Sequence, residues 1–161
     1  MMSGSAPTPL TMRPERDNRT VTSPCDSVLA LANGLAGGEE LAPGSPEFAA
    51  FAAGLSEVAK ALARMIARDG EGATKFVTIH VYGARSREEG RRIGRSIGVS
   101  PLVKTAIFGA DANWGRILSA AGNAGVAIQP DRVRISLGPV LLCAGGAGVA
   151  FSEEEAKAIL E

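Results

Sequence analysis

The sequence predicts an α/β protein of the layered α+β type, with helices packed on mixed sheets. Three stretches carry this prediction. After Ser45-Pro46, apolar residues recur at three- and four-residue spacing and predict a helix of about six turns. The β-branched and aromatic run 76–82 predicts a strand. Runs 132–138 and 140–143, joined by Gly138-Pro139, predict two further strands.

Length and composition narrow the functional classes. The 161 residues suffice for one domain with a hydrophobic core. Hydrophobic residues make up 45% and aromatic residues only 4%, so we expect a core of Ala, Val, Leu and Ile. Because 17 basic and 17 acidic residues cancel, nothing favours nucleic acid or an anionic membrane as a partner. No apolar run could span a membrane and no signal peptide is visible, so we expect a cytoplasmic protein.

The cysteines give no sign of a metal site. Cys25 and Cys143 lie far apart and lack the spacing of metal ligands, so no metal is expected. Isolated thiols are favoured, although a disulfide between them stays open at this point.

In the N-terminal half, proline, serine and glycine mark the predicted starts and ends of helices. Residues 1–19 predict a disordered lead-in, and 20–161 form the predicted domain. Ser23-Pro24 has the pattern of a helix start and predicts a first helix that ends near Asn33-Gly34. The long helix from Ser45-Pro46 is predicted to bury its apolar stripe, and Gly70 to end it.

The C-terminal half begins with the strand 76–82, in which His80 is assigned no role. A capping box at 86–89 predicts a helix with Ile93 and Ile97 facing inward. The arginines near this helix are interpreted as a solvated face, since no aromatic residues interleave with them. Beyond it we predict a short helical turn at Ser100-Pro101, a strand over 105–108, a helix after 111–116, and a last helix from Ser152.

The first candidate site is the stretch 69–75, Asp-Gly-Glu-Gly-Ala-Thr-Lys, between the long helix and the first strong strand. Gly70 and Gly72 can adopt positive φ and let a ligand approach the backbone. Glu71 would then be a fixed anion for a cationic substrate group. For this heptapeptide alone, a helix C-cap followed by a solvated acidic turn is the favoured alternative.

The second tract is 100–116, Ser-Pro-Leu-Val-Lys-Thr-Ala-Ile-Phe-Gly-Ala-Asp-Ala-Asn-Trp-Gly-Arg. We predict structural roles for its side chains. Trp114 is a packing anchor, Asp111 is a cap, and Arg116 pairs with Asp111. The glycine-rich run 145–148 lacks a following Lys-Ser/Thr, so as a phosphate cradle it is a weak candidate.

Together with 32–37 and Gly44-Ser45-Pro46, these two tracts resemble the ornithine acetyltransferase (glutamate N-acetyltransferase) family of arginine biosynthesis, over about 20–160. The resemblance implies acetyl transfer from N2-acetylornithine, or from acetyl-CoA, to glutamate through an acyl-threonine intermediate, with no resident cofactor. It implies sheets and helices in layers, and an oligomer or a complementary subunit. It identifies Glu71 as the substrate-binding glutamate.

The resemblance covers only the middle of the family's second subunit, so 20–161 is predicted to be a partial acetyltransferase-family domain. The family's nucleophile segment has no counterpart, and the catalytic residue is unknown. Leu10-Thr11-Met12 is similar to the family's Thr-Met start but lies too close to Thr20. Two functions stay open: a truncated or split enzyme that depends on another polypeptide, and an inactive remnant acting as a folded oligomerisation or interaction domain.

Overall fold

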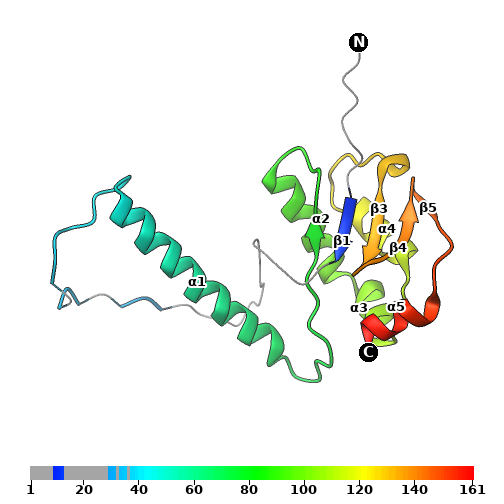
Figure 1. The fold of residues 1–161 in the computed structure, drawn as a ribbon, viewed down its shortest axis with the longest axis horizontal. Coiled ribbons are helices and arrows are strands. Elements are labelled where there is room, and N and C mark those ends of the chain that lie inside the picture. Colours follow the sequence, from blue (N-terminus) through cyan, green and yellow to red (C-terminus); the bar gives the residue numbers. More distant parts are fainter. Residues whose placement is uncertain (1–8, 13–28, 32, 36) are drawn as a thin grey trace, which may run out of the picture. The chain divides into compact units, whose positions relative to one another are not determined.

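The computed structural model describes residues 9–12, 29–31, 33–35 and 37–161 (Figure 1). The chain divides into two compact units. One contains 9–12 and 74–161, and the other ends at Ala73. The domain predicted over 20–161 stays a prediction, and its boundary at 19/20 lies outside the described residues. Most of the predicted lead-in, 1–19, lies outside the described residues, but Pro9–Met12 form strand β1.

The first unit is built on one five-stranded sheet. Its strands are β1, β2 (His80–Val81), β3 (Arg134–Leu137), β4 (Val140–Ala144) and β5 (Ala147–Gly148). The spatial order is β2-β1-β3-β4-β5, and only β1 and β3 run parallel. The sheet is therefore mixed, as predicted. The β3–β4 ladder shifts register between Ile135 and Ser136.

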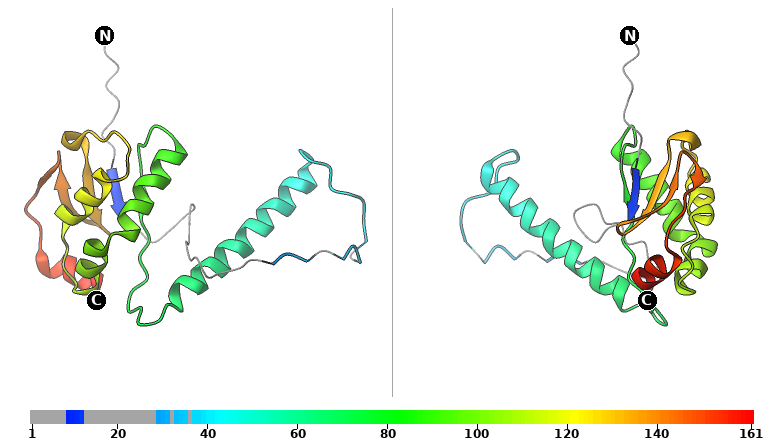
Figure 2. Two further views of the ribbon diagram at one scale, coloured as in Figure 1. Left: turned by 180° about the vertical axis from the view of Figure 1, so that it is seen from behind. Right: turned by 45° about the vertical axis from the view of Figure 1, so that its right-hand side comes forward.

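Four helices complete this unit: α2 (Arg87–Val99), α3 (Pro101–Phe108), α4 (Trp114–Gly122) and α5 (Glu153–Leu160). A 3-10 turn, Pro130–Arg132, precedes β3. In the right-hand view of Figure 2, α3 and α4 lie along one face of the sheet. Each helix starts at a side chain that accepts a backbone N–H. These caps are Ser86, Ser100, Asn113 and Ser152.

The core of this unit lies where these helices meet β3 and β4. It is aliphatic, as the composition predicts, and its largest fully buried side chains are Ile97, Ile135, Leu142 and Cys143. Ile93 and Ile97 face inward as predicted. Burial raises the pKa of the Cys143 thiol, so this side chain stays neutral and acts as a small apolar residue.

Helix α2 packs against the segment around β2 through two glycines, Gly94 and Gly98. A Cβ at Gly94 would lie 3.6 Å from Val81, and one at Gly98 would lie 3.6 Å from Ile79. The absence of side chains on this face of α2 therefore lets the chain around β2 pack directly on the helix.

Three secondary-structure predictions need correction. Residues 105–108 are the end of α3 and not a strand. The cap at Ser100 starts the helix, and Val103 and Ala106 bury its inner side. The strand predicted over 76–82 is reduced to β2. Of the helix predicted from Ser23, residues 23–28 lie outside the described residues, and 29–31 and 33–35 are not helical.

The second unit contains the long helix α1 (Pro46–Arg68), as the sequence predicts. Ser45 accepts a hydrogen bond from Phe48 N at 3.1 Å, and Asp69 N donates to Met65 O at 2.9 Å. The prediction that α1 buries its apolar stripe is wrong for this structure, since none of its residues is buried. Periodicity shows that a helix has an apolar face, but it does not say what covers that face.

Candidate functional site

The stretch after α1 forms a tight turn with Glu71 at its corner. Ala73 N donates to Gly70 O at 2.9 Å, and Gly72 has φ +70°. This is the pattern of a type II turn, in which the third residue needs positive φ. Gly70 does not use that freedom, because its φ is not positive. Gly72 is thus the glycine that the turn requires, and Glu71 is displayed next to it.

The Glu71 carboxylate is exposed, and it has no hydrogen bond or ion pair within the described part of the chain. A small cavity lies among α3, α4, β3 and β4, and Glu71 does not line it. The space that it leaves for a ligand is only about 10 Å³, far below the range of about 300–1,000 Å³ usual for ligand sites. The assignment of Glu71 to substrate binding stays a prediction.

Lys75, at the other end of the motif, has a structural role that the sequence did not reveal. Its Nζ donates to Ile107 O at 3.0 Å and to Phe108 O at 3.1 Å, at the C-terminus of α3. The same helix end is closed by Ala110 N to Ile107 O and by Asp111 N to Ala106 O, with Ala110 at φ 54°. This is a Schellman motif, and a lysine there also complements the helix dipole.

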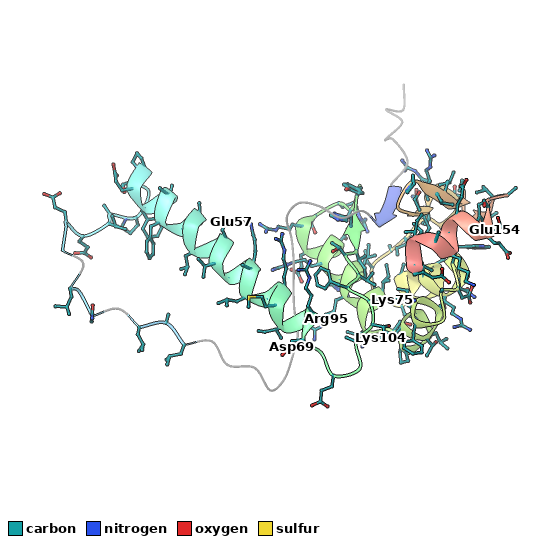
Figure 3. All side chains as sticks on the ribbon, turned by 60° about the horizontal axis from the view of Figure 1, so that its bottom comes forward. Glu57, Asp69, Lys75, Arg95, Lys104 and Glu154 are labelled. Carbon is teal, nitrogen blue, oxygen red and sulfur yellow. The ribbon has the colours of Figure 1, made fainter. Side chains whose placement is uncertain are left out.

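Replacing Lys75 by methionine is expected to lower the free energy of unfolding by about 1–2 kcal/mol, because two carbonyls lose a charged donor. Lys104, on α3 itself, makes no side-chain hydrogen bond among the described residues, so Lys104→Met should change stability by less than about 0.5 kcal/mol. Figure 3 labels both lysines. Urea denaturation measures the difference, and equal effects of the two substitutions would contradict the role of Lys75.

The tract 100–116 is a helix, a turn and a second helix start, and two predicted contacts are wrong. Asn113, not Asp111, caps α4: its Oδ1 accepts from Arg116 N at 3.1 Å. Asp111 Oδ2 accepts from Asn113 Nδ2 at 3.0 Å. The Arg116 guanidinium turns to α3, where Nη1 donates to Leu102 O at 3.1 Å and Thr105 Oγ1 at 3.3 Å. Arg116 therefore ties α4 to α3.

Trp114 is a packing anchor, as predicted. Its half-buried side chain packs against the core cluster. The indole lies directly over β5, because a Cβ added at Gly148 would be 2.9 Å from its Cζ2 and 3.0 Å from its Nε1. The Asn-Trp-Gly-Arg signature in this chain thus holds α4 to the sheet edge.

Of the glycine-rich run 145–148, Gly145 and Gly146 form the hairpin turn between β4 and β5, and Ala147–Gly148 are β5 itself. Gly145 and Gly146 have φ +60° and +74°, as the primed hairpin turns require. Gly146 N donates to Val133 O at 3.3 Å, so this N–H is not free for a phosphate. The structure gives this loop a structural role.

His80, to which the sequence assigned no role, is half-buried and stacks on Tyr82 with ring centroids 6.1 Å apart. Its Nε2 is buried and has no hydrogen-bond partner within the described residues. Near α2, Arg85 Nε lies 3.4 Å from Glu89 Oε2, and Arg92 Nη2 donates to Gly125 O at 2.8 Å. Two of the predicted solvated arginines therefore have structural partners.

Comparison with known proteins decides the family. The ArgJ family model matches residues 17–161. The chain belongs to the ArgJ family. It is 46% identical over 140 residues to the arginine biosynthesis bifunctional protein ArgJ of Geobacillus kaustophilus, a match covering 87% of this chain and 34% of that protein. It is 48% identical over 118 residues to the mitochondrial ArgJ protein of Schizosaccharomyces pombe, covering 73% and 26%.

A solved ArgJ structure supports the same assignment. The crystal structure of the arginine biosynthesis bifunctional protein from Bacillus halodurans superposes with a TM-score of 0.76 at 41% identity. The match covers 87% of this chain and 66% of that one. The layered fold of helices and mixed sheet is therefore that of an ArgJ protein. The chain spans about a third of the length of the curated ArgJ relatives it matches.

Thr11 and Glu71, the two residues that the resemblance brings into question, belong to different units of this ArgJ chain. Thr11 lies in β1, where its backbone is paired with His80 on one side and Ser136 on the other. Glu71 belongs to the other unit. In the described ranges, no group of three or more His, Cys, Asp or Glu side chains is arranged to hold a metal ion. No described helix is both long and apolar enough to cross a membrane.

Proposed function

We propose that this chain supplies the substrate-binding part of an acetyltransferase that moves acetyl from N2-acetylornithine to glutamate. The family match over 17–161 carries the proposal, because it contains both the Glu71 turn and the tract 100–116. The relatives at 44–48% identity are named for arginine biosynthesis, which supports the substrate class. We place the reaction in the cytoplasm.

The proposed chemistry proceeds through an acyl-enzyme. A threonine hydroxyl attacks the acetyl carbonyl of N2-acetylornithine, its proton passes to the leaving nitrogen, and ornithine departs as the C–N bond breaks. The amine of glutamate then takes the acetyl group and regenerates the threonine. Acetyl-CoA would serve as an alternative donor by transfer from its thioester. In this proposal the threonine belongs to the part of an ArgJ protein that this chain does not span.

Glu71 supplies the recognition of ornithine in this proposal. Ornithine carries ammonium groups, and a carboxylate held at a turn corner binds an ammonium through charge-assisted hydrogen bonds. In the described part of the chain no side chain of this protein competes for the Glu71 carboxylate. An exposed carboxylate that no described side chain of this protein neutralises suits this task.

Ornithine at millimolar concentration is expected to raise the melting temperature by about 2–5 °C, because a ligand of the folded state stabilises it. Glu71→Gln should abolish this shift while leaving the unliganded melting temperature within about 1 °C, since Glu71 is exposed. Glu57→Gln, at an exposed acid on α1, is the matched control and should keep the shift. An undiminished shift in Glu71→Gln would refute the assignment.

The activity test separates this chain from the complete enzyme. The purified chain, incubated with labelled N2-acetylornithine and glutamate, is expected to transfer no acetyl group. Addition of the remaining part of an ArgJ polypeptide should produce labelled N-acetylglutamate. Robust turnover by the chain alone would show that it needs no second polypeptide.

The second candidate function is an inactive family member that acts as an interaction domain. Two observations favour it: the exposed apolar face of α1 and the position of Glu71 outside the cavity. This function predicts no thermal shift with ornithine, N2-acetylornithine or glutamate, and no acetyl transfer after mixing.

A further inference from the structure

The turn that displays Glu71 has few interactions of its own to hold it in place. Within 70–74, which the structure describes throughout, the only hydrogen bond joins Ala73 N to Gly70 O at 2.9 Å. A Cβ built at Gly72 would meet nothing within 4 Å. The direction of the Glu71 carboxylate therefore depends on how the chain is held on either side of the turn.

Lys75 attaches the chain that leaves this turn. Its side chain is partly buried, and Nζ donates to Ile107 O at 3.0 Å and to Phe108 O at 3.1 Å. Among the described residues, these are the first hydrogen bonds after Glu71 that reach a distant part of the sequence. Four residues of chain span at most about 14 Å, so Glu71 stays within this distance of an anchored residue.

The helix end to which Lys75 is attached is itself fixed. Ile107 O accepts from Ala110 N at 3.1 Å as well as from Lys75. Val103 and Ala106 bury the inner side of α3 in the core. An ammonium bound to two carbonyls there is held firmly, because its hydrogen bonds are charge-assisted and the helix dipole favours a cation at this end.

The same contact joins the two tracts that carry the family resemblance. Lys75 is the last residue of 69–75, and Ile107 and Phe108 lie within 100–116. One side chain thus links the end of the Glu71 turn to the second tract. We propose that Lys75 is a positioning residue for substrate recognition, since it fixes the Glu71 turn by binding the last carbonyls of α3.

The substrate part of this inference rests on the proposed function, in which Glu71 binds ornithine. Lys75 does not touch the ligand. It orders the turn before the ligand arrives, so that binding does not have to. A turn without this attachment loses more conformational freedom on binding, and its affinity is lower for that reason.

The first measurement is the backbone order of the turn in the full 161-residue chain without ligand. NMR relaxation should give amide order parameters of about 0.8 for 71–73 in the unsubstituted protein and below about 0.6 in Lys75→Met, values typical of rigid and flexible backbone. Gly148→Ala is the control for a loss of stability in the same unit, because its added Cβ would lie 2.9 Å from Trp114 Cζ2. It should leave the order parameters of 71–73 unchanged.

The second measurement is ornithine binding by calorimetry, at a temperature where every variant is folded. Lys75→Met should raise the ornithine Kd at least about fivefold. Loss of a positive charge alone would strengthen the binding of a cationic ligand, so weaker binding reports positioning and not charge.

Two variants control the binding measurement. Lys75→Arg keeps a cation with several donors and should recover most of the affinity. Lys104→Met removes an ammonium that makes no side-chain hydrogen bond among the described residues, and it should not raise the Kd.

Each contrary result has its own meaning. Turn order that Lys75→Met leaves unchanged, or that Gly148→Ala lowers equally, overturns the role of Lys75. An ornithine Kd that Lys75→Met leaves unchanged or lowers also overturns it, and the proposed function then stands if Glu71→Gln abolishes binding. If the unsubstituted chain binds no ornithine while Lys75→Met still loosens the turn, the proposed function is refuted and Lys75 remains the residue that fixes Glu71.

Discussion

Substitution of Gly146 by alanine is expected to lower the free energy of unfolding by about 2–4 kcal/mol. Two effects add. Gly146 has φ +74°, which disfavours any L side chain, and a Cβ there would lie 2.6 Å from Pro130 O. The obstacle is backbone of the 3-10 turn before β3, so relief requires movement of the main chain. Urea denaturation of the full chain measures the loss.

Gly145 is the matched control for this substitution. It has a similar φ of +60°, but its added Cβ would lie 3.5 Å from Asp131 O, an ordinary contact. Gly145→Ala should therefore lower the free energy of unfolding by only about 1–2 kcal/mol, which is the cost of placing an alanine at positive φ. If the two alanine variants were equally stable, the close approach of the hairpin turn to Pro130 would not exist in solution.

Substitution of Gly148 by alanine is expected to cost about 1–3 kcal/mol, because the new methyl group would enter the indole of Trp114. Trp114→Phe in the same background should restore part of this loss, since the smaller ring leaves room for the methyl group. A double-mutant cycle on unfolding free energies measures the coupling, which we expect to exceed about 1 kcal/mol.

Gly122→Ala is the control for the Gly148 cycle. Gly122 is the last residue of α4, and nothing lies within 4 Å of a Cβ added there. Alanine favours helix over glycine, so this variant should be neutral or slightly more stable. Additive effects of Gly148→Ala and Trp114→Phe would contradict direct packing between the two residues.

Local chemistry was the part of the fold that could be predicted from the sequence. The starts of α1, α2 and α5 follow from Ser45, Ser86 and Ser152, each of which accepts a backbone N–H within its own first turn. The β3–β4 hairpin follows from alternating residues on either side of Gly138-Pro139. Such features depend on residues a few positions apart, so spacing is enough to reveal them.

The secondary-structure prediction failed for a short apolar run that could locally form either a helix or a strand. Residues 105–108 contain a β-branched and aromatic mixture typical of strands, yet they end α3. The helix wins because Val103 and Ala106 are buried on one side of it and Lys75 stabilises its C-terminus from 32 residues away. A run of four residues has no periodicity long enough to show this.

The candidate site also has a part that could be predicted from the sequence and a part that could not. The motif around Glu71 could be found from sequence because its glycines and its resemblance are local. The partners of Arg116 and Lys75 could not, since both donate to carbonyls of α3 that are brought to them by folding.

The sequence by itself determined the family, the helix starts, the hairpin and the amphipathic character of α1. Only the tertiary structure decided that β1 lies between β2 and β3, that Trp114 packs on Gly148, and that Lys75 closes the C-terminus of α3. The physical reason is the distance along the sequence over which each interaction acts. Caps and turns are satisfied by neighbouring residues, whereas strand pairing and burial depend on residues that are distant in sequence or belong to another polypeptide.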